Sequence, residues 1–270
     1  MPPATPRRMG PVRPPPPAPF AQPASALLSF ENVSKRYPDG GREIVVLKGE
    51  SFELQAGASA GIHGARHSGK STLLRLAAAI ESPDAGTIRV AGRDVTRISP
   101  AEHAELLRGT VALLTAADWA ASAGETLLDH VAMPLGSKGL TPREAKREAL
   151  LALDAVGVAA LAAEESAGSL SLGERARVML ARALVREPRL LLVDEPAPMP
   201  SLEDHDRFCA TLRRVARERG IALLIASESL GPLQGLGAQM KLSGGELLCT
   251  SEGSGTLVRG PWRAAASESA

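Results

Sequence analysis

The chain has 270 residues, of which 44% are hydrophobic and 23% are charged, so it can bury a core without disulfide or metal cross-links. Its formal net charge of +1 excludes an overall basic field that attracts nucleic acid, although a local basic patch remains open, and 3% aromatic residues disfavour a base-stacking surface. Two cysteines exclude a disulfide framework and fit a reducing compartment, and no apolar run approaches the ~18 residues of a membrane span.

Composition divides the chain into three parts. Residues 1–26 hold ten of the 21 prolines and no acidic residue, so we expect a disordered arm with polyproline II character. Residues 27–250 carry one continuous strand-and-helix pattern and are expected to form one α/β domain. Residues 251–270 are small and polar, and we expect a loose C-terminal tail.

Apolar patterning predicts the strands, which in chain order span residues 27–33, 43–47, 52–54, 59–62, 87–90, 111–114, 190–193 and 221–225. Turn residues at 37–41 connect the first two. Helical periodicity follows residues 64–71 and returns from 126 to about 167. The last two strands are continuous rather than alternating apolar runs, which is typical of central parallel strands covered on both faces.

Residues 64–71 match the pattern G-x-x-x-x-G-K-[ST] between an apolar strand and a helix, which is the context in which this pattern binds phosphate. Its glycines allow backbone N–H groups to surround phosphate oxygens, and the helix N-terminus adds partial positive charge. We expect Lys70 to reach the β- and γ-phosphates of ATP and the Ser71 hydroxyl to hold Mg²⁺. The predicted ATP-binding residues of this segment are Gly64, Ala65, Arg66, His67, Ser68, Gly69, Lys70, Ser71 and Thr72.

A pair of carboxylates follows the apolar run at 190–193. Asp194 is expected at the carboxyl edge of the sheet, where ligands bind in open α/β folds, and to hold Mg²⁺ through water. Glu195 is then placed to polarise the attacking water as a general base. An apolar strand followed by Asp-Glu is a weak signal alone, but together with the phosphate loop it predicts a site for ATP hydrolysis.

Between these two motifs, residues 170–184 read LSLGERARVMLARAL and continue to Asp194 without a gap, in the manner of a known signature segment and its following helix. With this segment, the chain resembles the ATP-binding subunit of ABC transporters from about residue 27 to residue 248. The resemblance assigns the signature to Ser171, Leu172, Gly173 and Glu174, and it places Tyr37 where the family stacks an aromatic ring on adenine. Phrases such as TLLDHVAMPL at 126–135 resemble the lipoprotein-releasing and macrolide-exporting branch.

The resemblance implies a P-loop NTPase fold, in which a RecA-like core carries an antiparallel β subdomain near the N-terminus and an inserted helical subdomain at about 117–175. It implies ATP and Mg²⁺ as ligands and a dimer, either a homodimer or a heterodimer with a second ATP-binding subunit. In that dimer, Ser171 and Gly173 contact the γ-phosphate held by the other subunit. It also implies a transmembrane permease on another chain and a cytoplasmic position at the inner face of the membrane, and it gives no role to nucleic acid.

Several positions depart from the family pattern. The glutamine that follows the strand at 111–114 is replaced by Ala116, and the histidine that follows the strand at 221–225 is replaced by Glu228. The aspartate of the loop after Glu195 falls on Ser201, or on Glu203 if that loop is two residues longer. Phosphoryl transfer depends on donors and positive charge around the γ-phosphate, so these replacements predict a subunit that binds ATP and hydrolyses it slowly.

One other segment resembles a motif of this family. Residues 242–246, LSGGE, look like the family signature but follow Asp194 instead of preceding it, so we interpret them as a hairpin turn. A non-transport regulatory or scaffold module that binds ATP without hydrolysis is the second functional hypothesis, and the retained Glu195 argues against it. Soluble ABC ATPases of translation or DNA repair need tandem cassettes or long coiled-coil insertions, neither of which the sequence contains.

Overall fold

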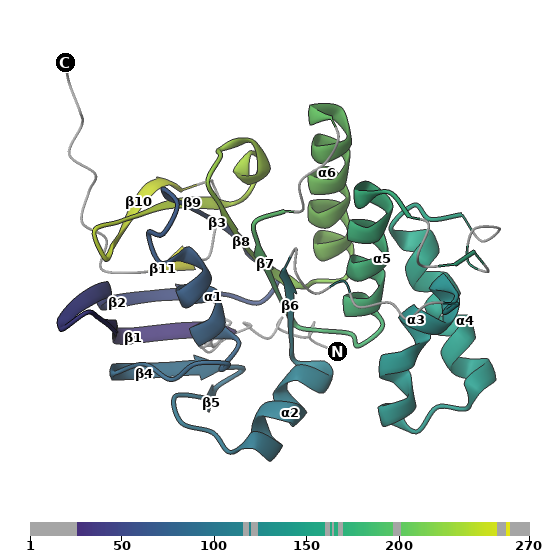
Figure 1. Ribbon diagram of the computed structural model, residues 1–270, viewed down its shortest axis with the longest axis horizontal. Coiled ribbons are helices and arrows are strands. Elements are labelled where there is room, and N and C mark those ends of the chain that lie inside the picture. Colours follow the sequence, from purple (N-terminus) through teal and green to yellow (C-terminus); the bar gives the residue numbers. More distant parts are fainter. Residues whose placement is uncertain are drawn as a thin grey trace, which may run out of the picture.

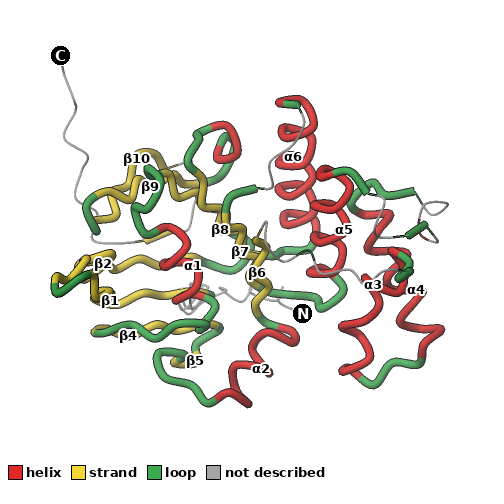
Figure 2. The backbone as a smooth tube through the Cα atoms, viewed as in Figure 1, coloured by secondary structure: helices red, strands yellow, loops and turns green. Residues whose placement is uncertain are grey.

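The computed structural model describes residues 26–115, 119, 124–159, 163, 165–166, 170–196, 201–252 and 258–259. Within these residues the chain forms two β-sheets, with helices packed between and beside them (Figures 1 and 2). Apart from residue 26, the predicted N-terminal arm lies outside the described residues.

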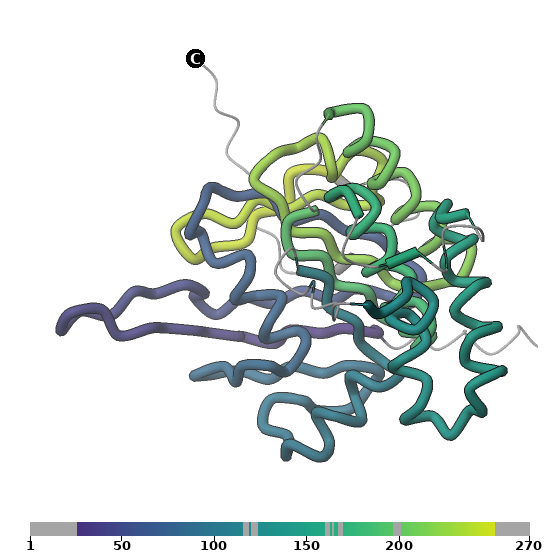
Figure 3. The backbone as a smooth tube through the Cα atoms, turned by 45° about the vertical axis from the view of Figure 1, so that its right-hand side comes forward, coloured from purple at the N-terminus to yellow at the C-terminus, as the bar shows by residue number. Residues whose placement is uncertain are grey.

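The first sheet is antiparallel, with the strand order β11-β2-β1-β4-β5. Its strands are β1 (Leu28–Asp39), β2 (Arg42–Leu54), β4 (Ala85–Val90), β5 (Arg93–Asp94) and β11 (Val258–Arg259). Strands β1 and β2 form a long hairpin that projects from the rest of the molecule (Figure 3). Its turn is made by Gly40 and Gly41, whose φ values of 52° and 89° are accessible to glycine without strain.

The structure differs from the sequence-based prediction at two places in this sheet. The strands expected at 43–47 and 52–54 are one strand, β2, because the register with β1 shifts between Val33 and Ser34 and lets the pairing continue past Gly49. The expected loose tail is wrong at 251–252, which belong to β10, and at 258–259, which pair with Glu53 and Leu54 as β11.

The second sheet has the order β10-β9-β3-β8-β7-β6, and all its neighbours are parallel except β9 and β10. Its strands are β3 (Ser59–His63), β6 (Val111–Thr115), β7 (Leu190–Asp194), β8 (Ala222–Ser227), β9 (Ala238–Ser243) and β10 (Glu246–Glu252). The turn between β9 and β10 is Gly244–Gly245, so the prediction of a hairpin at LSGGE is confirmed.

The helices and 3₁₀ turns are α1 (Lys70–Ala77), α2 (Pro100–Gly109), α3 (Leu127–Ala132), η1 (Met133–Lys138), α4 (Pro142–Ala155), α5 (Leu172–Leu184), α6 (Leu202–Glu218) and η4 (Gly231–Leu233). Helix α1 lies between the two sheets (Figure 1). Helices α5 and α6 cover the opposite face of the parallel sheet, and α3 and α4 pack beyond them. Among the described residues, the region expected to be helical from 126 to about 167 holds α3, η1 and α4, and residues 139–141 between η1 and α4 are not helical.

Strand β7 shows why both faces of the parallel sheet are apolar. Leu190 and Leu192 pack into the core formed with α1 and the antiparallel sheet. Leu191 and Val193, which alternate with them, pack into the core formed with α3 to α6. The strand's continuous apolar sequence is therefore required by its position between two hydrophobic cores, as predicted. In the part of the chain that is described, no helix combines the length and apolar character needed to cross a bilayer.

We expect Leu192→Ala to lower the free energy of unfolding by about 3 kcal/mol, because it removes a fully buried side chain and leaves a cavity. The matched control is Leu202→Ala, since the Leu202 side chain at the start of α6 is 84% exposed and its loss should change stability by about 0.5 kcal/mol or less. Urea denaturation of both variants checks this, and equal effects would contradict the assigned core.

Candidate ATP site

The phosphate loop connects β3 to α1 at the carboxyl edge of the parallel sheet. A Cβ on Gly64 would lie 2.6 Å from the Leu242 carbonyl oxygen. A Cβ on Gly69, whose φ is +104°, would lie 2.3 Å from the Val46 side chain. Gly64 is therefore required by the close approach of the Leu242 backbone, and Gly69 by its positive φ and the Val46 side chain. His67 between them takes a left-handed φ of 64° that residues with a Cβ rarely adopt.

Lys70 begins α1 and folds back over the loop. Its side-chain Nζ donates to the carbonyl oxygens of Gly64 and Ala65, at 2.8 and 3.0 Å, and the residue is only 7% exposed. The Ser68 hydroxyl is buried beside it and makes no hydrogen bond within the described residues. An ammonium, an unpartnered hydroxyl and a helix N-terminus thus meet at one point, which is the composition of an anion site.

Asp194 and Glu195 lie next to this loop because β7 ends beside the start of α1. The Ser71 hydroxyl donates to Asp194 Oδ1 at 3.0 Å. Glu195 has a left-handed φ of 52°, and its N–H continues the pairing with β8 by donating to the Ala226 carbonyl at 2.9 Å. Such backbone geometry at a residue with a Cβ is often retained at functional sites.

The end of β8 holds the Glu195 carboxylate through both of its oxygens. The Ser227 hydroxyl, which is fully buried, donates to Oε1 at 2.9 Å, and the Glu228 backbone N–H donates to Oε2 at 2.8 Å. His63 Nε2 donates to the Glu228 carbonyl at 3.0 Å and ties this turn to β3. The carboxylate therefore has a fixed orientation at the edge of the sheet.

These residues line a pocket of about 440 Å³. Its walls are Tyr37, Ile44, Val46, Arg66, His67, Ser68, Gly69, Lys70, Ser71, Thr72, Asp194, Glu195 and Glu228. Tyr37 reaches it from the β1–β2 hairpin, and its hydroxyl donates to the Glu81 carboxylate. Burial and this hydrogen bond raise the pKa of Tyr37. The pocket thus combines an aromatic ring, a phosphate-type loop and the carboxylates of Asp194 and Glu195, which is what a nucleoside triphosphate with Mg²⁺ requires, and it also holds the Glu228 carboxylate.

A family model described as ABC transporter matches residues 47–198 of the chain. The lipoprotein-releasing system ATP-binding protein LolD of Nitratidesulfovibrio vulgaris is 34% identical over 225 residues, which cover 83% of this chain and 96% of that protein. The LolD protein of Geobacter metallireducens is 33% identical over 224 residues, covering 83% and 99%. The chain belongs to the ABC transporter family.

The fold agrees with this assignment. The dimeric ATP-binding cassette MJ0796, solved in a post-hydrolysis state with ADP and Pi, superposes with a TM-score of 0.74 at 23% identity, covering 82% of this chain and 96% of that one. The prediction of a P-loop NTPase fold with a RecA-like core and an antiparallel β subdomain is confirmed, and so is the resemblance to the LolD branch.

The residues predicted to form the signature do not line the phosphate pocket of the same chain. Ser171 is the N-cap of α5, and it forms a capping box with Glu174 in which each side chain accepts from the other residue's backbone N–H. These hydrogen bonds lower the pKa of Glu174. Leu172 is 51% exposed. None of the four signature positions lines the pocket described above.

The other positions that are predicted to depart from the ABC pattern are placed as follows. Ala116 lies outside the described residues. Ser201 is the N-cap of α6 and accepts from the Asp204 N–H at 3.1 Å. Glu228 lines the phosphate pocket, at the carboxyl end of β8 where its position was predicted.

Sequence reasoning missed Ser227, His63 and Glu81. Ser227 is the last residue of β8, next to Glu228, and the parallel pairing of β7 with β8 brings it to Glu195, so a polar residue at that strand end was the available signal. His63 ends β3 in the same way. Glu81 carried no sequence signal, because a turn after α1 places it.

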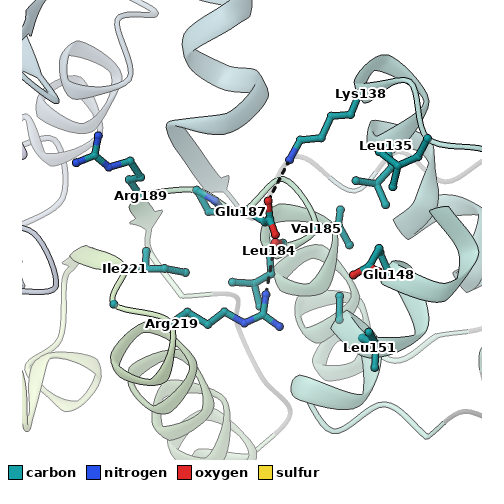
Figure 4. A pocket seen from close by; sticks show the side chains of 14 residues that line it. Leu135, Lys138, Glu148, Leu151, Leu184, Val185, Glu187, Arg189, Arg219 and Ile221 are labelled. Atoms are coloured by element: carbon teal, nitrogen blue, oxygen red, sulfur yellow. Dashed lines mark hydrogen bonds and ion pairs between the residues drawn. The ribbon is translucent and has the colours of Figure 1, made fainter. Parts of the chain in front are cut away.

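A second and larger cavity, of about 780 Å³, lies where β7 and β8 begin, at the other end of these strands from the phosphate loop (Figure 4). Lys138 from η1 crosses its mouth, and its Nζ donates to the Arg186 carbonyl at 2.9 Å and lies 3.8 Å from the Glu187 carboxylate. Arg219 points into it and donates to the Leu184 carbonyl at 3.5 Å. The cavity lies between η1, α4 and the segments that lead into β7 and β8, and it shares no lining residue with the ATP pocket.

Proposed function

We propose that this chain binds ATP with Mg²⁺ in the 440 Å³ pocket, hydrolyses it slowly and drives an ABC transporter whose permease is a separate chain. One observation carries the proposal: the Lys70 loop, the Ser71–Asp194 pair and Glu195 converge in one pocket at the carboxyl edge of the parallel sheet. Membership of the ABC transporter family supports it.

In this proposal the backbone N–H groups of the loop and the N-terminus of α1 bind the phosphates. Lys70 exchanges its contacts with the Gly64 and Ala65 carbonyls for contacts with the β- and γ-phosphates, and the buried Ser68 hydroxyl gains a partner. Tyr37 stacks on the base from the hairpin side. The positive end of the site therefore faces the triphosphate and the aromatic wall faces the nucleoside.

The residues present fit Mg²⁺. The Ser71 hydroxyl and the Asp194 carboxylate place hard oxygen atoms 3.0 Å apart, beside a loop suited to phosphate. When bound there, the ion neutralises charge that develops on the phosphate oxygens. Ser71 is the direct protein ligand in this arrangement, and Asp194 orients it and the water around it.

Glu195 is the general base in this proposal. Its carboxylate is oriented by Ser227 and by the Glu228 N–H, so it can accept a proton from water at a fixed position. The Glu228 side chain adds negative charge to the same pocket. Since the γ-phosphate becomes more easily transferred when donors and cations surround it, this charge raises the barrier and makes turnover slow.

The signature segment gives the reason for a dimer. Ser171 and Gly173 begin α5 outside their own subunit's pocket, so in our proposal they complete the ATP site of a second subunit. That subunit is either a second copy or a less altered ATP-binding chain. The proposed permease places the chain in the cytoplasm at the inner face of the membrane. Purification only as a fully active homodimer would contradict the heterodimer version.

We expect Glu228→His to raise the rate of phosphate release about tenfold or more, because it replaces a carboxylate near the γ-phosphate with a hydrogen-bond donor. Glu228→Gln is the matched control, since it removes the charge without adding an imidazole and should give a smaller increase. Steady-state phosphate release at saturating ATP checks both variants. No increase in either would contradict the assignment of this position to the γ-phosphate.

A further inference from the structure

The Tyr37 ring in the ATP pocket is held by a residue outside it. Tyr37 lies near the end of β1, and its hydroxyl donates to Glu81 Oε2. The same hydroxyl lies 3.5 Å from the Thr72 hydroxyl. Both partners belong to α1 or to the turn that follows it, so the hairpin is fastened to the helix that begins at Lys70.

Glu81 reaches Tyr37 because the chain reverses sharply after α1. The helix ends at Ala77, and Ala79 takes a left-handed φ of 55°. The backbone N–H groups of Ile80 and Glu81 then both donate to the Arg75 carbonyl, at 2.9 and 3.4 Å. This reversal carries the Glu81 side chain back along the helix toward the hairpin.

The Glu81 carboxylate is itself oriented from both sides. Arg75 Nη1 donates to Oε1 at 3.4 Å, while Tyr37 donates to Oε2. The Glu81 side chain is 23% exposed, less than half the exposure of the Arg75 side chain. Burial and the Glu81 contact raise the pKa of Tyr37, so the phenol remains a proton donor at neutral pH. The hydrogen bond between Tyr37 and Glu81 is therefore made by two partly buried groups whose orientation is set by further contacts.

We propose that Glu81 is the positioning residue for the nucleoside end of ATP, fixing the Tyr37 ring at a set distance from the phosphate loop. This proposal rests on the proposed ATP-binding function. Helix α1 presents Lys70 to the triphosphate at its first residue, and Thr72 and Glu81 anchor the ring to that same helix. A ring held in place before the nucleotide arrives loses less conformational freedom on binding.

If Glu81 acted only through its charge, its removal would change ATP affinity in the opposite direction. A carboxylate near a site for a polyanion weakens binding, so removing Glu81 should strengthen the binding of any triphosphate if the residue acted only through its charge. If it acts through Tyr37, its removal weakens binding of a ligand that carries a base and spares a ligand that has none. The sign of the change therefore separates the two explanations.

The experiment measures the dissociation constants of Mg²⁺–ATP and of Mg²⁺–tripolyphosphate, which lacks a nucleoside, for the full chain. We expect Glu81→Ala to weaken ATP binding about five- to tenfold, while tripolyphosphate affinity stays the same or increases. Glu81→Gln keeps an acceptor for the Tyr37 hydroxyl and should recover most of the loss. In a Tyr37→Phe background, Glu81→Ala should add nothing.

The matched control is Glu43→Ala. Glu43 lies on the same hairpin, and its carboxylate pairs with Arg36 at 3.2 Å and does not line the ATP pocket. It reports the effect of removing one acidic charge from this region and should leave the ratio of the two affinities unchanged. Thermal unfolding of each variant shows whether the chain is folded. If Glu81→Ala is not folded, Tyr37→Phe removes the same hydrogen bond while keeping the ring, and it should show the same selective loss of ATP affinity.

Three results would overturn the proposal. Glu81→Ala could weaken the binding of ATP and of tripolyphosphate equally, it could leave ATP affinity unchanged, or it could weaken ATP binding just as much in the Tyr37→Phe background as in the wild type. Failure of the proposed function looks different. In that case the wild-type chain binds neither ligand, or Lys70→Ala leaves both affinities unchanged, and the positioning role falls with it.

Discussion

Lys70→Ala is expected to weaken ATP binding by at least about 100-fold, because charge-assisted hydrogen bonds each contribute about 1.5–3 kcal/mol and the side chain makes two such contacts. Its Nζ lies 2.8 and 3.0 Å from the Gly64 and Ala65 carbonyls, in the position from which it can turn to phosphate oxygens. Calorimetric titration with Mg²⁺–ATP measures the change.

The control for this variant is Lys146→Ala. Lys146 lies on α4, its ammonium pairs with Asp129 at 3.0 Å, and its side chain is 47% exposed, so it carries the same charge far from the pocket. Its loss should leave ATP affinity within about twofold of wild type, since exposed ion pairs contribute little. If Lys70→Ala also stays within this range, the phosphate-loop assignment is wrong.

Glu195→Gln should bind ATP as the wild type does, and its rate of phosphate release should fall by about 100-fold or more, because an amide cannot take a proton from water. The substitution is nearly isosteric. The glutamine carbonyl can accept from the Glu228 N–H while its NH₂ group donates to the Ser227 hydroxyl, so the side chain keeps its orientation and loses only its basicity. A single-turnover assay separates this chemical step from nucleotide binding.

Glu218→Gln is the control for the second variant. Glu218 stands in the last turn of α6, its side chain is 55% exposed, and its carboxylate pairs with Arg214 at 2.9 Å. The variant should release phosphate at the wild-type rate. Residual release above about a tenth of the wild-type rate in Glu195→Gln would show that another group acts as the base.

Local sequence predicted the parts of the fold that local chemistry determines. The phosphate loop requires glycine at 64 and 69 for close packing, and strand β7 requires an apolar residue at each position from 190 to 193, so both are visible in the sequence. The break expected between 47 and 52 was wrong because a shift of register in β1 lets β2 continue, and such a shift depends on the paired strand.

The residues of the candidate site also divide into those that a local motif predicts and those that only tertiary contacts bring together. Lys70, Ser71 and Asp194 stand in motifs whose spacing follows from the strand–loop–helix geometry. Ser227 contacts Glu195 only because β7 and β8 are neighbours, and Glu81 contacts Tyr37 only because Ala79 turns the chain back after α1. Contacts made by tertiary pairing leave no spacing rule in one sequence.

The most direct test is a paired measurement on the purified chain: ATP bound per chain and phosphate released in the same sample, with Mg²⁺ and about 1 mM ATP, the upper end of ordinary KM values. We predict about one ATP bound per chain, lost in Lys70→Ala, with slow phosphate release that disappears in Glu195→Gln. A chain that binds no ATP at this concentration would contradict the proposed function.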